Sequence, residues 1–375
     1  MILTLIFIIV LIYILLIWWL NLGFDKVEDF KLQDLPNTTL FSVIIPFRNE
    51  EKNLPQLLGS ILKLNYKTPL FEVIFVNDDS EDESTKIINK HLQSSKIHFK
   101  IIDRLRTSNS PKKDAISTAI RIAQNNWIIT TDADCVLPKY WLDTFDEFIQ
   151  IKDTIAIAGP VKFTGPTSFF TRFQILDTLS LQSATMGGFG IKKPFMCNGA
   201  NFAYKKSAFE LVKGFDGNDS VASGDDVFLL QKFIKTYPND IYYLKSSKSI
   251  VTTQVVSSIK DFINQRIRWA SKSSRYKSLF PKIIGLIVLI TNFLLVSLLA
   301  LLSLNLITVK TVGLIWLIKI SIDLLPIFKT ARFFKQEHIL LSYIFVSLLY
   351  PFLTVYIALL IPFGTYNWKG RTFKN

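Results

Sequence analysis

Short apolar runs alternate with longer segments of helical period in the first half of the chain. Each run is rich in β-branched and aromatic residues and is bounded by turn-forming residues, which is typical of buried strands. The predicted strands are 41–46, 71–76, 99–103 and 127–129, and the predicted helices between them are 54–64, 84–92 and 112–125. This alternation predicts an α/β fold with a mostly parallel sheet and helices on both faces.

The pattern continues less regularly up to residue 256. Residues 156–161 are predicted to form another core strand, and residues 169–183 an amphipathic helix. The glycine-containing segment 186–190 is predicted to be flexible and is a candidate lid. Residues 197–204 read as a turn that leads into a strand, for which a purely structural turn is the alternative.

Three uncharged stretches frame this domain, at residues 1–24, 283–309 and 339–368. Each exceeds the roughly 20 apolar residues that cross a bilayer. The first lacks a basic leader and a small-residue cleavage site, so an uncleaved anchor is expected. The predicted organisation is an anchor (1–24), a linker (25–39), a catalytic domain (40–256), a basic interfacial helix (257–280), a membrane region of two or three helices (281–368) and a basic tail (369–375).

One segment of the membrane region carries charge. Lys319 and Asp323 stand four residues apart within 311–328, on one face of a helix. Such a pair is costly inside a bilayer and needs partners. This segment is therefore either a span with a paired charge or an interfacial or re-entrant helix.

The net charge of +13 fits a membrane protein. Basic residues gather between 260 and 282, beside an apolar run, as expected at a cytoplasmic face against anionic lipid. Nucleic-acid binding is the alternative for a basic chain, but no nucleic-acid motif is present. Cys135 and Cys197 show no metal-binding spacing, and a disulfide is not expected in the cytosol.

Candidate chemistry stands at the ends of the predicted strands. Asp132 and Asp134 follow the strand at 127–129 and can converge on one hard divalent cation, although two solvated aspartates are the alternative. Glu50, Asp78 and the lysines at 112 and 113 also follow strands or open helices. In a parallel sheet these ends share one edge, where ligands bind. A helix cap for Asp78 and a solvated loop for the lysines remain alternatives.

A second pair of acids opens a later apolar helix at Asp225–Asp226. A carboxylate there can take the proton of an attacking hydroxyl as a general base. Helix capping is the alternative explanation.

Taken together, these motifs resemble those of membrane-bound family-2 glycosyltransferases, which have the GT-A nucleotide-sugar fold. The matching segments are 42–50 (SVIIPFRNE), 76–82 (VNDDSED), 112–115 (KKDA), 132–134 (DAD) and 265–269 (QRIRW). The last matches the Gln-x-x-Arg-Trp motif in full. An interfacial helix that grips lipid headgroups through arginine and tryptophan is its alternative interpretation.

The resemblance implies a role for each donor-side residue. Asp78 would contact the base of a nucleoside diphosphate, Asp132 would lie near the ribose and diphosphate, and Asp134 would bind Mg²⁺ or Mn²⁺ with Asp132 nearby as a second ligand. The remaining donor-binding residues are Pro46, Arg48, Glu50, Lys112 and Lys113. Asp79 departs from the family, which often has glycine or another small or polar residue there.

The resemblance also implies the acceptor side. Asp226 would be the general base and Asp225 would support it, where the family usually has Glu-Asp. The acceptor and the diphosphate would meet Asn198, Gly199, Gln265, Arg268 and Trp269.

The expected function is that of an inverting, metal-dependent glycosyltransferase. It would move a sugar from a UDP- or GDP-sugar to a lipid or glycan acceptor, with its catalytic domain at the cytoplasmic face of the cell (inner) membrane. Membrane lipids are expected partners and nucleic acid is not. The alternatives are a processive polysaccharide synthase subunit, a catalytically inactive membrane scaffold, a nucleotidyltransferase and a transporter.

Overall fold

The computed structural model describes residues 2–218, 221, 223–363 and 365–374. These residues form two compact units. The α/β unit consists of residues 28–164 and 196–254, and the helical unit consists of residues up to 27, 165–195 and those from 255 onward. The residues with candidate chemistry are divided between the two units.

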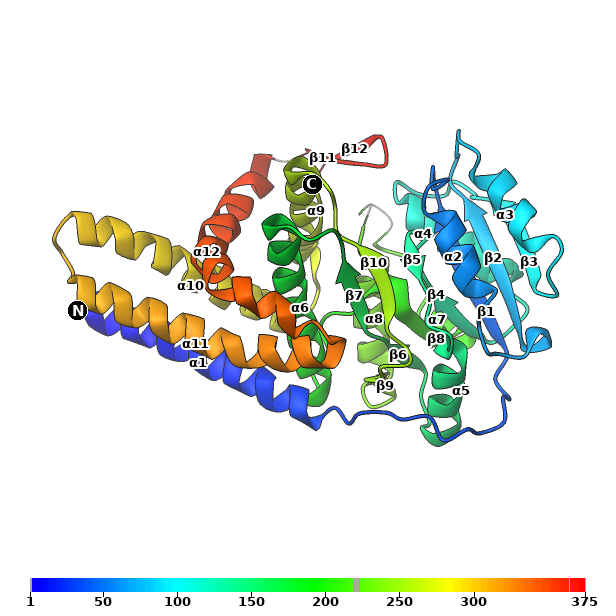
Figure 1. Ribbon diagram of the computed structural model, residues 1–375, viewed down its shortest axis with the longest axis horizontal. Coiled ribbons are helices and arrows are strands. Elements are labelled where there is room, and N and C mark those ends of the chain that lie inside the picture. The colour runs from blue at the N-terminus through cyan, green and yellow to red at the C-terminus, as the bar shows by residue number, and fades with distance from the viewer. Residues whose placement is uncertain (1, 219–220, 222, 364, 375) are drawn as a thin grey trace. The chain divides into compact units, whose positions relative to one another are not determined.

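A seven-stranded sheet forms the centre of the α/β unit (Figure 1). Its strand order is β3-β2-β1-β4-β8-β6-β9. The strands are β1 (Phe41–Phe47), β2 (Phe71–Asn77), β3 (His98–Asp103), β4 (Trp127–Thr130), β6 (Ala156–Ala158), β8 (Phe202–Lys205) and β9 (Ile241–Tyr243). Neighbouring strands are parallel except where β8 pairs with β4 and with β6. The predicted α/β fold with a mostly parallel sheet is confirmed.

The helices of the α/β unit lie beside this sheet (Figure 1). They are α2 (Leu54–Ile61), α3 (Ser84–Leu92), α4 (Pro111–Ile122), α5 (Trp141–Ile151), α7 (Lys206–Leu211) and α8 (Asp225–Thr236), with short 3-10 turns at Thr68–Leu70 and Gly199–Asn201. Strands β1, β2 and β4 are buried along almost their whole length. Continuous runs of valine, isoleucine and phenylalanine suit strands that are covered on both faces.

The segment 156–161 is not one strand, contrary to the prediction. The chain bends at Gly159–Pro160, so β6 joins the large sheet, whereas β7 (Val161–Thr164) joins a second sheet with β5 (Cys135–Val136) and β10 (Val251–Gln254). Asn201 holds the bend: its carbonyl accepts from Gly159 N at 2.8 Å and its side-chain amide donates to Pro160 O at 2.9 Å. A Cβ at Gly159 would collide with this amide.

The linker at 33–39 is irregular but firmly held. Its backbone N–H groups donate to buried carboxylates of α5: those of Gln33 and Leu35 to Glu147, and that of Thr39 to Asp146. These bonds satisfy carboxylates that would otherwise be costly to bury. The linker therefore forms part of the α/β unit.

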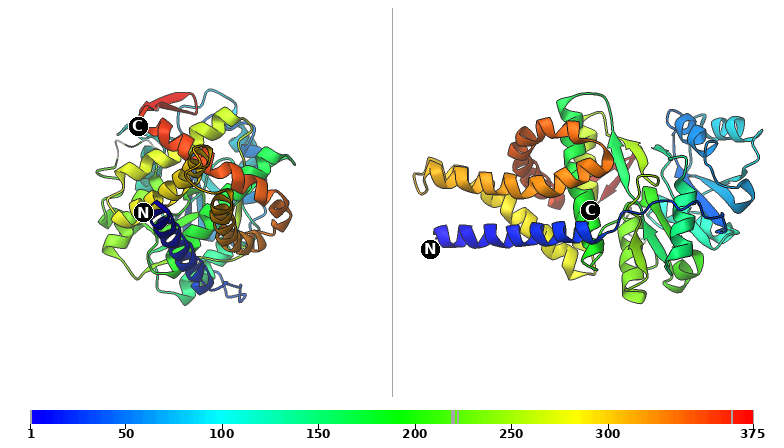
Figure 2. Two further views of the ribbon diagram at one scale, coloured as in Figure 1. Left: turned by 90° about the vertical axis from the view of Figure 1, so that its left-hand side faces the viewer. Right: turned by 60° about the horizontal axis from the view of Figure 1, so that its bottom comes forward.

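Four helices of the helical unit are long and apolar enough to cross a membrane, by length and composition. They are α1 (Ile2–Lys26), α10 (Leu279–Ser303), α11 (Val309–Phe334), and the segment Glu337–Leu360, in which a 3-10 turn (Glu337–Ser342) precedes α12 (Tyr343–Leu360). Figures 1 and 2 show α1 and α11 side by side. The unit also contains α6 (Phe169–Gly190), α9 (Ile259–Ser271), 3-10 turns at Lys272–Arg275 and Ile361–Phe363, and a hairpin of β11 (Thr365–Trp368) and β12 (Arg371–Lys374).

The charged pair in α11 has the partners that its burial requires. Lys319 Nζ lies 2.9 Å from Asp323 Oδ2, and the Tyr13 hydroxyl of α1 donates to Asp323 Oδ1 at 2.7 Å. Pairing of this kind lowers the cost of an ionised group in an apolar surrounding.

Residues 186–190 are helical, so the expectation of a flexible lid is wrong. They form the last turns of α6, which extends seven residues beyond the predicted end at 183. The cause is close packing of α6 on α1: a Cβ at Gly23 would collide with the Gly187 carbonyl, and one at Gly190 would collide with the Gly23 carbonyl. The glycines here allow two helix backbones to approach each other.

Candidate functional site

The candidate site of the α/β unit lies at the carboxyl ends of β1, β2 and β4. These strands are parallel neighbours, so the loops that follow them meet at one sheet edge. The loops carry Arg48 and Glu50, Asp78 and Asp79, and Asp132 and Asp134. The helices α4 and α8 bring Lys112 and the pair Asp225–Asp226 to the same place.

Lys112 links the two predicted aspartate pairs. Its Nζ lies 2.6 Å from Asp132 Oδ1 and 3.3 Å from Asp225 Oδ2. Burial of the ammonium group opposes its charge, but attraction to Asp132 and Asp225 outweighs this effect and raises the pKa of Lys112 above its ordinary value. The lysine therefore remains a cation between the carboxylates.

Asp134 lies beside this cation, two residues after Asp132. Desolvation by the surrounding protein, together with repulsion from the Asp132 carboxylate, raises the pKa of Asp134 to about 6, although the side chain keeps contact with solvent. Two carboxylates that repel each other provide hard oxygen ligands, which suit Mg²⁺ or Mn²⁺ when substrate phosphates supply others. Among the described residues, no cluster of three or more His, Cys, Asp or Glu side chains could hold a metal ion. These two aspartates fit a metal shared with a substrate diphosphate.

Arg104 was not anticipated from the sequence, although it follows β3 directly. Its buried guanidinium lies 2.6 Å from Asp78 Oδ1 and 3.3 Å from carboxylate oxygens of both Asp79 and Asp114. Asp114 in turn accepts from the backbone and side chains of Thr107 and Ser108, which lowers its pKa despite its partial burial. Arg104 thus fixes the position of Asp78, the predicted base-binding residue.

The backbone conformation after Asp78 explains why the position of Asp79 suits glycine, the residue from which this sequence departs. Asp79 has φ 56°, a left-handed conformation in which glycine is favoured. Arg48 stabilises this turn by donating from Nη1 to the carbonyls of Asp78 and Asp79, each at 2.7 Å. Asp79 also pairs with Arg106. Contacts with arginine side chains thus stabilise an aspartate at a position where the backbone favours glycine.

The other predicted donor-side residues have local partners. Pro46 lies in β1, opposite Val76 of β2. Glu50 is buried, and its Oε2 accepts from Asn53 Nδ2 at 2.6 Å at the start of α2. Lys113 is also buried, but it donates to the carbonyls of Asn218 at 2.6 Å and Val221 at 2.8 Å. Lys112 and Lys113 therefore serve different parts of the unit.

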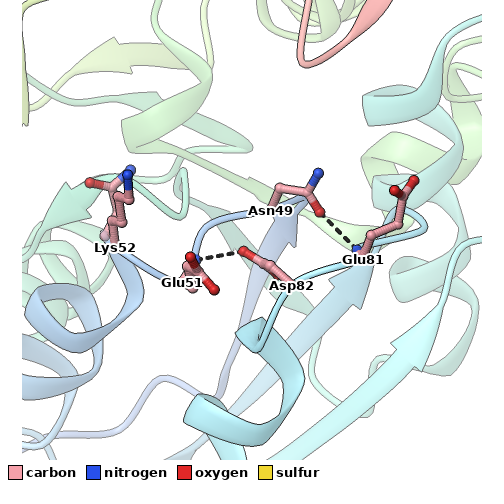
Figure 3. A pocket seen from close by; sticks show the side chains of 6 residues that line it. Asn49, Glu51, Lys52, Glu81 and Asp82 are labelled. Atoms are coloured by element: carbon pink, nitrogen blue, oxygen red, sulfur yellow. Dashed lines mark hydrogen bonds between the residues drawn. The ribbon is translucent and has the colours of Figure 1, made fainter.

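A pocket of about 410 Å³ opens beside these loops (Figure 3). Its wall is crossed by two hydrogen bonds, from Glu81 N to Asn49 Oδ1 at 2.8 Å and from Glu51 N to Asp82 Oδ2 at 3.0 Å. Hydrogen bonds to Asp82 outweigh its partial desolvation and lower its pKa. The lining residues are Asn49, Glu51, Lys52, Asn53, Glu81 and Asp82. The pocket borders the predicted site, and its lining is not composed of the predicted site residues.

The predicted acceptor-side residues of the α/β unit lie around Gly199. The Gly199 N–H donates to Asp226 Oδ2 at 3.2 Å, and its carbonyl accepts from Thr130 Oγ1 at 2.7 Å. A Cβ at Gly199 would lie 2.7 Å from Asp225 Oδ2 and 3.3 Å from Lys112 Nζ. Asn198 caps the following turn by accepting from Ala200 N at 3.0 Å. A side chain at this position would displace the Asp225 carboxylate, because the acids at the start of α8 pack against this backbone.

The remaining predicted residues, Gln265, Arg268 and Trp269, lie on α9 of the helical unit. This helix begins at Ile259, and the side chain of Ser258 caps it by accepting from Asp261 N. The motif is thus helical, as expected for an amphipathic segment. The helix that carries it, Ile259–Ser271, is shorter than the predicted helix 257–280.

The contacts above bring several charged side chains of the α/β unit together. A partly buried cation, two carboxylates suited to a metal, and a second pair of carboxylates lie within one cluster. Such a cluster can bind a diphosphate and offers a base to a hydroxyl.

Residues 42–212 match the protein-family model described as glycosyl transferase family 2. These residues form a family-2 glycosyltransferase domain. The chain is 26% identical over 246 residues to the probable glycosyltransferase YdaM of Bacillus subtilis (strain 168), which covers 64% of this chain and 56% of that protein. It is 25% identical over 238 residues to a poly-beta-1,6-N-acetyl-D-glucosamine synthase of Staphylococcus epidermidis, covering 61% and 53% of the two chains. The chain thus spans about half the length of these curated relatives.

One solved structure supports a GT-A fold for this chain. A mannosyltransferase from Pyrobaculum calidifontis, solved with GDP-Man and Mn²⁺, superposes with a TM-score of 0.56 at 16% identity. The match covers 92% of this chain and 95% of that one.

Proposed function

We propose that this glycosyltransferase is a metal-dependent, inverting enzyme that transfers a sugar from a nucleoside-diphosphate donor to a lipid or glycan acceptor. The observation that carries the proposal is the position of Lys112 between Asp132 and Asp225. This contact joins the predicted donor carboxylates to the helix that carries the predicted base.

On the donor side, Asp78 would accept a hydrogen bond from an N–H of the base. Arg104 and the Arg48-supported turn hold Asp78 in place before any donor binds. Lys112 would place its positive charge against the diphosphate, a role that its raised pKa supports.

Asp132 and Asp134 would hold Mg²⁺ or Mn²⁺, which when bound neutralises charge on the leaving diphosphate. The mannosyltransferase of similar fold was solved with Mn²⁺, which supports this assignment.

Transfer would be a single displacement. Asp226 takes the proton of the acceptor hydroxyl as the hydroxyl oxygen attacks the anomeric carbon, and the bond from that carbon to the diphosphate breaks. Gly199 N holds one oxygen of Asp226, which orients the carboxylate. Asp225 supports the reaction by holding Lys112.

The acceptor is proposed to be membrane-associated. Among the described residues, four helices could span a membrane by length and composition, which suits a lipid-linked substrate. We place the catalytic domain at the cytoplasmic face of the cell (inner) membrane, because nucleotide sugars are made in the cytoplasm. A processive polysaccharide synthase is the second candidate, favoured by the similarity to the poly-beta-1,6-N-acetyl-D-glucosamine synthase.

The test is a transfer assay in purified membranes with Mg²⁺ or Mn²⁺. Labelled UDP- and GDP-sugars are supplied with endogenous lipid extract, and Asp134→Ala is assayed in parallel. We expect label in the organic phase that depends on Asp134. Label only in polymer would favour the processive synthase. Release of no nucleoside diphosphate from any donor would contradict the proposal and favour the inactive scaffold.

A further inference from the structure

We infer that Arg266 is a positioning residue that orients Gln265 and Trp269 of the Gln-x-x-Arg-Trp motif. The inference rests on the proposed function, because it concerns the motif assigned to the acceptor and the diphosphate. Arg266 occupies a position within the motif to which the sequence pattern gives no role. Its contacts all lie within the helical unit.

The start of α9 is fixed on α6. The side-chain amide of Gln174 donates to Val256 O at 2.9 Å and accepts from Val256 N at 3.2 Å. One turn further, Phe262 packs edge-on against Phe170 and Phe173, with ring centroids 5.6 and 6.0 Å apart. The register of the motif is therefore set by α6.

Arg266 makes the buried ionic contact between these helices. Its Nε lies 2.6 Å from Asp177 Oδ2, and both side chains are less than one-tenth exposed. Burial of two charges is costly unless geometry and further hydrogen bonds compensate. Apolar side chains in place of such a pair often give equal protein stability. The other contacts of Arg266 therefore indicate what its charge contributes.

Two further contacts of Arg266 are to the motif itself. Arg266 Nη1 donates to Gln265 Oε1 at 2.6 Å, and the guanidinium carbon lies 4.3 Å from the centre of the Trp269 ring. The same guanidinium lies 4.4 Å from the Phe262 ring. One planar group, anchored by Asp177, thus fixes both an amide and an indole.

This arrangement selects the chemistry that Gln265 can offer. A guanidinium has only N–H donors, so its partner in Gln265 must be the carbonyl oxygen. The amide nitrogen of Gln265 is then the group available to a substrate, and it donates to phosphate or hydroxyl oxygens. The guanidinium over Trp269 fixes the plane on which a sugar ring can stack.

The test replaces the ion pair without leaving a charge unpaired. In the full-length protein, Asp177→Leu is combined with Arg266→Met, because apolar replacement of a buried pair is often neutral for stability. Arg266→Lys is the second variant: it keeps the charge but lacks the fork that reaches both Asp177 and Gln265. The control is Lys319→Met with Asp323→Leu, a second ion pair of this unit whose side chains are largely buried.

We expect both Arg266 variants to keep their melting temperature and to lose transfer kcat by about 10–100-fold, as for a group displaced by about an ångström. The control should retain transfer within about threefold, since its ion pair does not contact the motif. Wild-type kcat in the folded double variant would overturn the inference and leave the pair a structural contact.

A second readout does not depend on activity. With 5-fluorotryptophan incorporated, the Trp269 fluorine resonance is assigned by Trp269→Phe and compared between wild type and the Arg266 variants. We expect it to shift and broaden when Arg266 is replaced. An unchanged resonance would overturn the inference. If wild type transferred no sugar, the proposed function would fail, and this resonance would still decide whether Arg266 orients Trp269.

Discussion

Lys112 Nζ lies 2.6 Å from Asp132 Oδ1 and contacts Asp225 on its other side. One cation therefore binds a residue from each of the two aspartate pairs. Replacement by methionine should lower kcat/KM by about 10²–10³, the usual cost of removing one preorganised charge from a transition state. Nucleoside-diphosphate release from the donor measures this loss.

Lys86→Met is the control for the Lys112 variant. Lys86 is exposed on α3 and pairs with nearby Glu83 at the protein surface. Its replacement should change the rate less than about twofold, as exposed ion pairs contribute little. Equal rates for Lys112→Met and wild type would remove Lys112 from the donor site.

Metal affinity should depend on pH through Asp134. Because the pKa of Asp134 is raised to about 6, a proton must leave before the carboxylate binds a cation. The affinity for Mn²⁺ alone, followed by electron paramagnetic resonance of the free ion, should rise about tenfold per pH unit up to 6 and level off above it. Asp134→Asn should abolish the slope, whereas a pH-independent affinity in wild type would contradict the prediction.

The same shift affects the metal-free protein. An acid whose pKa is higher in the folded state binds more protons there than in the unfolded state. This group therefore makes the free energy of unfolding decrease as pH rises from the ordinary aspartate range to 6. Thermal unfolding of Asp134→Asn should lack this contribution.

Gly199→Ala should impair transfer more than it impairs folding. Its Cβ would lie 2.7 Å from Asp225 Oδ2, so the carboxylate must move away from Lys112. We expect a loss of about tenfold or more in kcat, since displaced groups at a reacting centre are costly. Gly59→Ala, within α2 and with open space around it, should keep full activity and gain about 0.5–1 kcal/mol of stability. Full activity of Gly199→Ala would contradict this account.

Asp78 and Asp79 should differ in their effect on donor binding. Asp78 is buried and held by Arg104, whereas Asp79 is about half exposed. Asp78→Asn should weaken nucleoside-diphosphate binding by about tenfold, the effect of one charged hydrogen bond, and Asp79→Asn by less than about threefold. Calorimetric titration with UDP and GDP measures both, and the reverse order would assign the base to Asp79.

Much of the fold follows from local pattern. The strands β1, β2 and β4 are apolar runs buried on both faces, which is why periodicity located them within one or two residues. The break at Gly159–Pro160 and the full length of α6 were missed because both depend on distant partners. Asn201 holds the first, and α1 packs against the second.

In the site too, the residues fixed by local pattern were predicted and those fixed by distant partners were not. Strand ends predicted that Asp78, Asp132 and Lys112 belong to one edge, because parallel topology brings such ends together. Arg104 was missed because its partners lie ten to 26 residues away in sequence. Nothing in the local sequence therefore distinguishes it from a surface arginine. Lys113 was grouped with Lys112 by adjacency, but helix geometry directs it to the carbonyls of Asn218 and Val221.

The proposed mechanism requires Asp226 to activate an acceptor for attack on a nucleotide sugar. The most direct test is Asp226→Asn, in which transfer of label from the donor and calorimetric binding of the same donor are measured on one preparation. We expect transfer to fall by about 10²–10⁴, the range for loss of a general base, while the donor Kd stays within about threefold. Transfer at the wild-type rate by a folded, donor-binding Asp226→Asn would contradict the account.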